Sequence, residues 1–494
     1  MPKETLYERL GLPQDASPEE IQKAYRKIAQ RLHPDLHSKP GVTDRFMSIQ
    51  EAYEVLSDPV QKTEYDYGLP SSVKQPSPVT TATSYSRRTL TRSFEPQLIY
   101  ALVDLNLRKE LISENRPQLN LCLVIDCSTS MQGVRLDTAK ETAIELVRQL
   151  QPTDILSIVR FSDRAEILLP ANSLLNQQNL ELQVQMLRAG GGTEIFQGLN
   201  LGMHEIRRFR HANRINHLIL ITDGRTYGDE ELCLQLAEQA TSLQVGLSAF
   251  GIGGSWNDTF LDTLTAKTGG SSIFISDPKD IRQFLLEKAI GLSDIYANQV
   301  TYSFEIPGNV DLSYAFRIFP DATPLSNTPP IIIGAVPRKN RLAFILEFHV
   351  NTIPQGASQV TLAEGQLSYQ TPGNPDSSTF IQRLALQRPI APVVDTSPPP
   401  MAIVQAMSYL TLYRMQEKAR ADMARGDFQA ASRRLQNLAT HLLAQGQRDL
   451  ARQVINEINH IQQHHSFSTD GEKQIKYGTR SLIIPSVREE KEHD

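Results

Sequence analysis

The stretch LNLCLVIDCSTS, residues 119–130, decides how the centre of this chain folds. Residues 119–125 are apolar except for Asn120, which is typical of a strand that is buried on both faces of a parallel sheet. A carboxylate and two hydroxyls follow within one tight turn, at Asp126, Ser128 and Ser130. Since open α/β sheets bind their ligands at the carboxyl ends of the strands, this turn is a candidate binding site.

Three further apolar runs follow, and amphipathic segments separate them. The runs are DILSIVRF (154–161), NHLILITD (216–223) and VGLSAFGIG (245–253). Strands that alternate with amphipathic helices predict a doubly wound, Rossmann-like α/β sheet, which we expect over residues 117–291.

Two later segments bring more oxygen atoms to the same predicted sheet edge. The loop GGGT (190–193) ends in the hydroxyl of Thr193, and the strand at 216–223 ends in Asp223. Hydroxyls and carboxylates without His or Cys suit a small, hard divalent cation. A DxSxS turn can also serve simply as a helix N-cap, so the turn by itself leaves a structural interpretation open. A phosphate loop is not favoured, because no GxxxxGK[ST] lysine follows the glycines.

The five positions resemble the metal-ion-dependent adhesion site of von Willebrand factor A domains, which combines a DxSxS turn with a distal threonine and a distal aspartate. The resemblance covers the whole α/β segment and implies a bound Mg²⁺ or Mn²⁺. It implies that the ion is coordinated, directly or through water, by Ser128, Ser130 and Thr193, and that Asp126 and Asp223 act mainly through water or hydrogen bonds. Such a site leaves one position for an Asp or Glu of a protein partner.

The N-terminal residues 1–70 are predicted to be helical around a turn-rich centre. One helix has an apolar stripe, and its opposite face carries Lys23, Arg26, Lys27 and Arg31. It ends before His33-Pro34-Asp35, because a proline disfavours helical dihedrals in the residue before it. Each feature by itself is also what a chance helix stop and a solvated helix face would give.

Taken together, these features resemble the J domain of DnaJ-type co-chaperones. In that family the HPD tripeptide and the basic helix face engage a DnaK-type chaperone and stimulate its ATP hydrolysis. The matching positions here are His33, Pro34, Asp35, Lys23, Arg26, Lys27 and Arg31. Thr63 departs from the usual family pattern at a peripheral contact. The Gly/Phe-rich stretch and the CxxCxGxG repeats of general DnaJ proteins do not occur in the sequence, so client choice is expected to lie elsewhere in the chain.

The rest of the chain divides by composition and period. Residues 71–93 are rich in Ser, Thr and Pro and predict a flexible linker. A period of two over 296–390 predicts an antiparallel β-sandwich, which we expect to include the strand-like segment 94–116, so that the α/β domain is inserted in it. A helical-hairpin region is expected at 398–464 and a flexible, charged tail at 465–494.

Length and composition limit the function classes. At about 150 residues per domain, 494 residues predict about three domains. A net charge of −5 gives no reason to expect a nucleic-acid partner. Three scattered cysteines predict reduced thiols, and the sequence shows no signal-peptide core or membrane span, so we expect a cytoplasmic protein.

Catalytic motifs find little support in the sequence. We see no nucleophile elbow, HExxH motif or nucleotide-binding loop, so we expect a protein that is not an enzyme. The leading hypothesis is an adaptor that recruits a DnaK-type ATPase to an acidic partner held through Mg²⁺. An alternative is an assembly scaffold that works with a separate ATPase and uses its J domain only for docking. A hydrolase that uses the Mg²⁺ site is the weakest hypothesis, because no general base is evident beside it.

Overall fold

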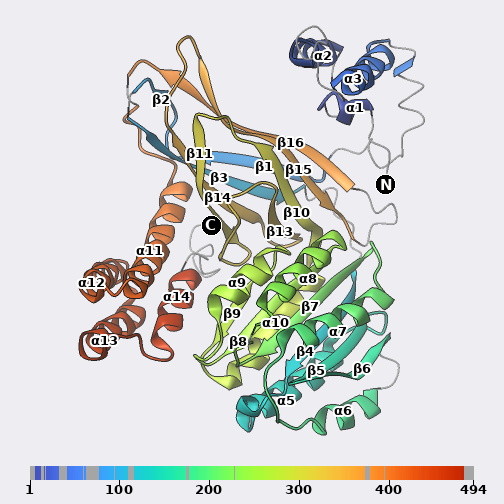
Figure 1. Cartoon of the computed structure of the whole chain (residues 1–494), viewed down its shortest axis with the longest axis vertical. Coiled ribbons are helices and arrows are strands. Elements are labelled where there is room, and N and C mark those ends of the chain that lie inside the picture. The colour runs from blue at the N-terminus through green and yellow to red at the C-terminus, as the bar shows by residue number, and fades with distance from the viewer. Residues whose placement is uncertain are drawn as a thin grey trace, which may run out of the picture.

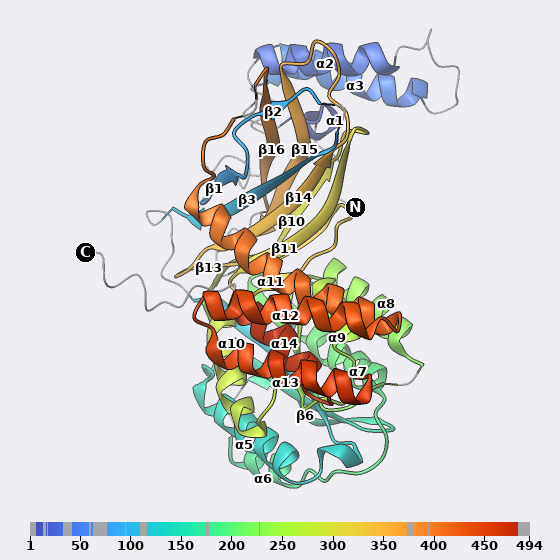
Figure 2. The same ribbon diagram turned by 90° about the vertical axis from the view of Figure 1, so that its left-hand side faces the viewer.

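The computed structural model shows four parts (Figures 1 and 2). In both views the β-sandwich lies between the small N-terminal helices and the α/β domain, and the C-terminal helices lie beside the latter two. The structure describes residues 6–12, 16, 18–32, 42–58, 61–62, 77–93, 95–108, 116–173, 177–226, 228–372, 379–393 and 395–482. Among these residues, no helix combines the length and the apolar character that crossing a bilayer requires.

The N-terminal part is helical, as predicted. It contains α1 (Leu6–Arg9), α2 (Pro18–Leu32) and α3 (Val42–Ser57). The helices bury a small core that includes Tyr7, Ile21 and Leu56. The rings of Tyr25 and Tyr53 stack across α2 and α3 with their centroids 4.0 Å apart. Apolar residues at helical spacing therefore meet between the two helices, as the stripes in the sequence require.

The α/β domain is built on a six-stranded sheet with the order β6-β5-β4-β7-β8-β9. All neighbouring strands are parallel except the edge pair of β5 and β6. The strands are β4 (Gln118–Asp126), β5 (Ile155–Phe161), β6 (Ala165–Ser173), β7 (Arg214–Thr222), β8 (Val245–Ile252) and β9 (Ser272–Ile275).

Helices cover both faces of this sheet, which confirms the predicted fold class. The helices are α5 (Val134–Gln149), α6 (Gln177–Gln185), α7 (Ile195–Arg208), α8 (Glu230–Ser242), α9 (Asp258–Ala266) and α10 (Ile281–Ser293). Alternate residues of β4 enter the two cores: Leu123 packs with α5 and α10, whereas Val124 packs with α7, α8 and α9. The apolar run at 119–125 is therefore buried from both sides.

The β-sandwich consists of two five-stranded sheets that share one core. Their orders are β1-β3-β14-β11-β12 and β13-β10-β15-β16-β2. The strands are β1 (Val79–Tyr85), β2 (Leu90–Thr91), β3 (Gln97–Leu107), β10 (Ile295–Glu305), β11 (Val310–Phe319), β12 (Thr323–Pro324), β13 (Ile331–Pro337), β14 (Leu342–Val350), β15 (Gln359–Gln370) and β16 (Thr379–Ala391). Because β3 precedes the α/β domain and pairs with β14, which follows it, the α/β domain is inserted in the sandwich.

The prediction of a flexible linker over residues 71–93 is wrong for its second half. Residues 79–85 form β1, which pairs with β3 in an antiparallel register from Val79 with Leu107 to Tyr85 with Ala101. Residues 90–91 form β2, which runs parallel to the end of β16. The Thr, Val and Tyr residues in this stretch favour strands. The prediction of a linker relied on the Ser and Pro content and gave this preference too little weight.

The C-terminal part comprises α11 (Met401–Ala424), α12 (Phe428–Ala444), α13 (Arg448–His464) and α14 (Gly471–Ser481). A flexible tail from 465 onward is therefore a wrong prediction for residues 471–481. The first turns of α11 cover the outer face of one sandwich sheet, where Ile403 and Leu410 pack with Phe316 and Ile345. The helical part is thus joined to the sandwich by an apolar contact.

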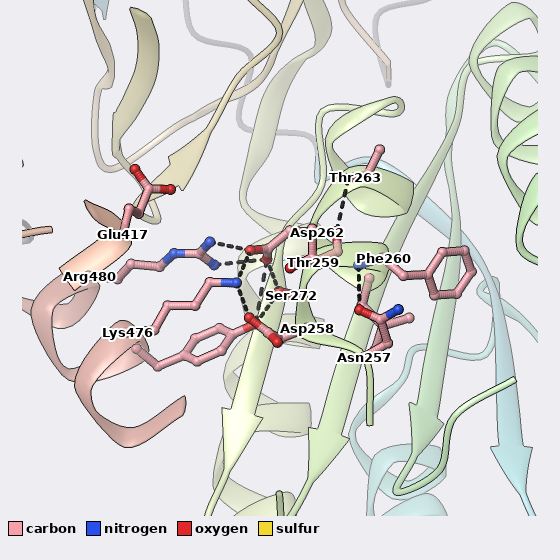
Figure 3. A network of polar contacts seen from close by, with 12 residues as sticks. Asn257, Asp258, Thr259, Phe260, Asp262, Thr263, Ser272, Glu417, Lys476 and Arg480 are labelled. Carbon is pink, nitrogen blue, oxygen red and sulfur yellow. Dashed lines mark hydrogen bonds and ion pairs between the residues drawn. The ribbon is translucent and has the colours of Figure 1, made fainter. Parts of the chain in front are cut away.

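A buried polar network joins α14 to α9 of the α/β domain (Figure 3). Lys476 forms ion pairs with Asp258 and with Asp262, and its Nζ lies 2.7 Å from the Oδ2 of Asp262. Arg480 binds both carboxylate oxygens of Asp262, which also accepts a hydrogen bond from Ser272. All four charged side chains are at most 10% exposed. The C-terminal helix is therefore held by charge pairing in the interior of the molecule.

Candidate metal centre

The candidate site lies at the carboxyl ends of the neighbouring parallel strands β4 and β7. Asp126 is the last residue of β4, and Asp223 directly follows β7. The turn after β4 contains a short 3₁₀ helix, Thr129–Met131, which places Ser128 and Ser130 beside each other. The parallel register of the two strands therefore brings both carboxylates to one edge of the sheet.

Asp126 is fully buried and organises the turn that follows it. Its Oδ1 accepts a hydrogen bond from the backbone N–H of Ser128 at 2.8 Å, and its Oδ2 accepts one from the hydroxyl of Thr222 at 2.6 Å. Burial raises the pKa of the Asp126 carboxyl to about 6, against the opposing effect of these hydrogen bonds. Both carboxylate oxygens of Asp126 thus accept hydrogen bonds from protein groups. This agrees with a carboxylate that acts on an ion mainly through water or hydrogen bonds.

A chain of hydroxyls links the turn to the second carboxylate. The Oγ atoms of Ser128 and Ser130 lie 3.1 Å apart, and Ser130 donates to the Oδ1 of Asp223 at 2.7 Å. The other oxygen of Asp223 pairs with the guanidinium of Arg135. The side-chain oxygen atoms of Ser128, Ser130 and Asp223, three of the five predicted residues, are therefore linked in one chain.

The GGGT loop packs against the same turn and delivers Thr193. The backbone N–H of Gly190 donates to the carbonyl of Cys127 at 2.8 Å, and that of Thr129 donates to the carbonyl of Gly191 at 3.1 Å. The side chain of Thr193 lies against Gly224, where a Cβ would stand 2.9 Å from the Thr193 Oγ1. All five predicted residues therefore meet at one place.

The donor set fits a hard divalent ion. The predicted ligands are hydroxyl and carboxylate oxygens, and in the described residues no group of three or more His, Cys, Asp or Glu side chains offers a metal site of another kind. Cys127 is buried beside the turn, and burial raises the pKa of its thiol to about 12, so that it is a neutral group there. The chemistry of the residues present thus agrees with Mg²⁺ or Mn²⁺.

Three residues near the site were not predicted from the sequence. Thr222 binds Asp126, Arg135 binds Asp223, and Asp163 accepts a hydrogen bond from the N–H of Gly192 at 2.7 Å. Thr222 directly precedes Asp223 at a strand end, so its position was a signal that could have been used. Arg135 lies at the start of a helix and Asp163 in a turn between strands. Charged residues are common at such positions, so neither residue could be recognised from the sequence.

The second predicted site belongs to the N-terminal helices. The side chains of Lys23, Arg26 and Lys27 are exposed on α2, and Arg31 belongs to the same helix. His33, Pro34 and Asp35 lie outside the described residues. The structure therefore describes the basic helix but not the tripeptide that follows it.

Comparison with protein families identifies three of the four parts. The DnaJ domain matches residues 5–66, and the von Willebrand factor type A domain matches residues 120–287. A third family, described as the Sll0103-like C-terminal alpha-helical domain, matches residues 401–485. Its match includes α14 and so agrees with the correction of the predicted tail.

Two curated relatives resemble different portions of the chain. The uncharacterized protein sll0103 of Synechocystis is 27% identical over 338 residues, which cover 66% of this chain and 79% of that protein. The chaperone protein DnaJ of Methanosarcina thermophila is 53% identical over 60 residues, which cover 12% of this chain. The chain spans only 16% of the length of that DnaJ protein.

A solved structure shares the fold of most of the molecule. The von Willebrand factor type A protein from Catenulispora acidiphila matches 81% of this chain and 96% of its own chain, with a TM-score of 0.65. The sequence identity is 14%, so this likeness establishes the fold alone. The chain thus combines a DnaJ domain, a von Willebrand factor A domain that is inserted in a β-sandwich, and a C-terminal helical domain of the Sll0103-like type.

Proposed function

We propose that this protein is a J-domain adaptor that recruits a DnaK-type chaperone to a protein partner, which its A domain binds through a divalent ion. The observation that carries the proposal is the presence, in one chain, of a J domain and of an A domain whose five predicted ligand residues meet at one sheet edge. Because the two domains share a chain, a captured partner stays at high effective concentration near the chaperone.

At the metal centre, Ser128, Ser130 and Thr193 are the proposed ligands of Mg²⁺ or Mn²⁺. The bound ion would supply a positive charge that attracts a carboxylate of the partner. Asp126 holds the backbone N–H of Ser128 and Asp223 holds the hydroxyl of Ser130, and the two carboxylates contribute negative charge from both sides of the turn. The role of the A domain in this proposal is binding rather than catalysis.

The J-domain half is tested by measuring ATP turnover by a bacterial DnaK in the presence of the full chain. We expect His33→Gln to abolish the stimulation that the wild-type chain gives, since the proposal assigns to His33 a contact with the ATPase. Glu54→Gln is a suitable control, because Glu54 is exposed on α3 and outside the basic face of α2. Equal turnover with and without the wild-type chain would contradict the co-chaperone role and favour a scaffold that only docks.

The metal half is tested by titrating the full chain with Mn²⁺ and following the free ion by electron paramagnetic resonance, with Mg²⁺ as the competitor. We expect Ser130→Ala to weaken binding at least tenfold, because Ser130 Oγ lies between Ser128 and Asp223. Ser242→Ala removes an exposed hydroxyl at the end of α8 and should leave the affinity unchanged. Failure to take up Mn²⁺ at millimolar concentration, both by the wild-type chain and by a folded variant that lacks the charge of Arg135 beside Asp223, would refute this half.

A further inference from the structure

Arg135 contacts the candidate metal centre and is not one of the ligands that the fold family implies. Its guanidinium pairs with the Oδ2 of Asp223 and donates to the carbonyl of Ser130 at 3.1 Å. Asp223 is fully buried, whereas the Arg135 side chain is 36% exposed. The buried carboxylate therefore already faces a positive charge supplied by the chain itself.

The local structure does not explain why an arginine is found here. Arg135 is the second residue of α5, where the positive end of the helix dipole disfavours a cation. The guanidinium also passes close to Gly253 after β8, where a Cβ would lie 3.3 Å from Nη2. The contacts that favour this position come from the metal centre, namely from Asp223 and the carbonyl of Ser130.

We propose that Arg135 is a resident cation that competes electrostatically with the divalent ion for the negative charge of Asp223. This inference rests on the proposed metal-dependent function. Of the two carboxylates at the centre, Asp223 is neutralised by Arg135, so the ion meets less negative charge than the sequence motif suggests. The ion is then held weakly by the protein alone and more tightly once a partner adds a carboxylate, which makes ion binding and partner binding mutually dependent.

A purely structural role for Arg135 predicts the opposite change in ion affinity when the arginine is removed. If the guanidinium only fixed the orientation of Asp223, removing it would loosen Ser130 as well and weaken ion binding. If it competes with the ion, removing its charge strengthens ion binding, because two like-charged cations no longer lie close together. The direction of the change in affinity therefore separates the two roles.

The experiment compares Mn²⁺ binding, again without any partner, by the full wild-type chain and by Arg135→Gln and Arg135→Lys. We expect Arg135→Gln to lower the dissociation constant at least tenfold, which corresponds to about 1.4 kcal/mol. Arg135→Lys keeps the charge and should remain within about threefold of the wild type. Arg135→Met, which keeps an unbranched stem at this position without the charge, replaces Arg135→Gln if circular dichroism shows that variant to be unfolded.

The outcomes distinguish this inference from the proposed function. An unchanged or higher dissociation constant for Arg135→Gln, with measurable binding by the wild type, overturns the role of Arg135 and leaves the metal centre standing. Binding by Arg135→Gln but not by the wild type supports the inference directly. No binding by either chain, with both folded, overturns the metal centre and the inference together.

Discussion

Gly224 shows how closely the residues of the candidate metal centre are packed. It follows Asp223, and the space where its side chain would lie is filled by Thr193, whose Oγ1 and Cγ2 would stand 2.9 Å and 3.2 Å from a Cβ. These distances are shorter than ordinary contacts between side chains. Any residue larger than glycine at this position must therefore push Thr193 away from the strand end.

We expect Gly224→Ala to weaken Mn²⁺ binding and to destabilise the A domain by about 1–3 kcal/mol, the usual cost of overpacking. Urea unfolding and the Mn²⁺ titration measure the two effects. Gly190→Ala is the matched control in the same centre, since a Cβ there meets no atom within 4 Å. If the two variants behave alike, Thr193 is not held where the structure places it.

At this scale the sequence predicted which residues of the candidate centre lie close together better than it predicted their surroundings. Asp126 and Asp223 could be found because each ends an apolar run, and Ser128 and Ser130 because they follow within the same turn. Arg135 could not be found, since its contact with Asp223 joins residues far apart in the chain. Pairing of that kind depends on the parallel register of β4 and β7 and on the start of α5, which no local pattern reveals.

At the level of elements, charged side chains join α14 to α9 of the A domain. Lys476 and Arg480 are 4% exposed and are matched by Asp258 and Asp262 of α9. Burial by itself raises the pKa of Asp262, but Arg480 and Lys476 outweigh burial and lower it well below its usual value. The carboxylate therefore remains charged in the folded protein at any pH near neutrality.

Replacing Asp262 by Asn leaves buried cations short of a partner, so we expect a loss of about 3–5 kcal/mol at pH 7. Because the pKa of Asp262 is lowered on folding, its contribution is fully present above the unfolded value of about 3.9 and disappears as the pH falls below it. Urea unfolding followed by the fluorescence of Trp256 should show a constant difference from pH 7 to 5 that shrinks below pH 4.

The control for this prediction is a surface ion pair of the same domain. Glu238 pairs with Lys267, and their side chains are 64% and 31% exposed. Glu238→Gln should cost less than about 1 kcal/mol, because solvent screens such pairs. An Asp262→Asn chain as stable at pH 7 as the Glu238→Gln chain would show that α14 is not held by this network.

The same helix explains why the sequence predicted a flexible tail. The stretch GEKQIKYGTRS (471–481) contains Ile475 as its only aliphatic residue of any size, so no apolar stripe indicated a helix that packs on another domain. Lys473, Lys476 and Arg480 are buried nonetheless, because acidic and carbonyl groups of the α/β domain receive them. Burial by charge pairing depends on a second domain and cannot be predicted from the segment alone, because the helical spacing of Lys473, Lys476 and Arg480 is also that of a solvated helix face.

For the whole molecule, the sandwich, the A domain and the C-terminal helices contact one another at several places. Arg317 of β11 donates to the carbonyls of Gly269 and Gly270 at 2.6 Å and 3.0 Å, which ties the sandwich to the A domain. The N-terminal half of α11 covers the sandwich, and α14 contacts the A domain. The insertion could be predicted because strand 98–107 is apolar on both faces, whereas the contacts between domains could not.

The insertion also sets an order in which the molecule can be completed during its synthesis. β3 leaves the ribosome roughly 230 residues before β14, so at about 5–20 residues per second its free edge waits on the order of 10–50 s for its neighbour. During that interval β1 can protect only the other edge of β3. Nascent chains that stop within the inserted domain therefore carry only β1, β2 and β3 of the sandwich, with an open strand edge that is prone to aggregate.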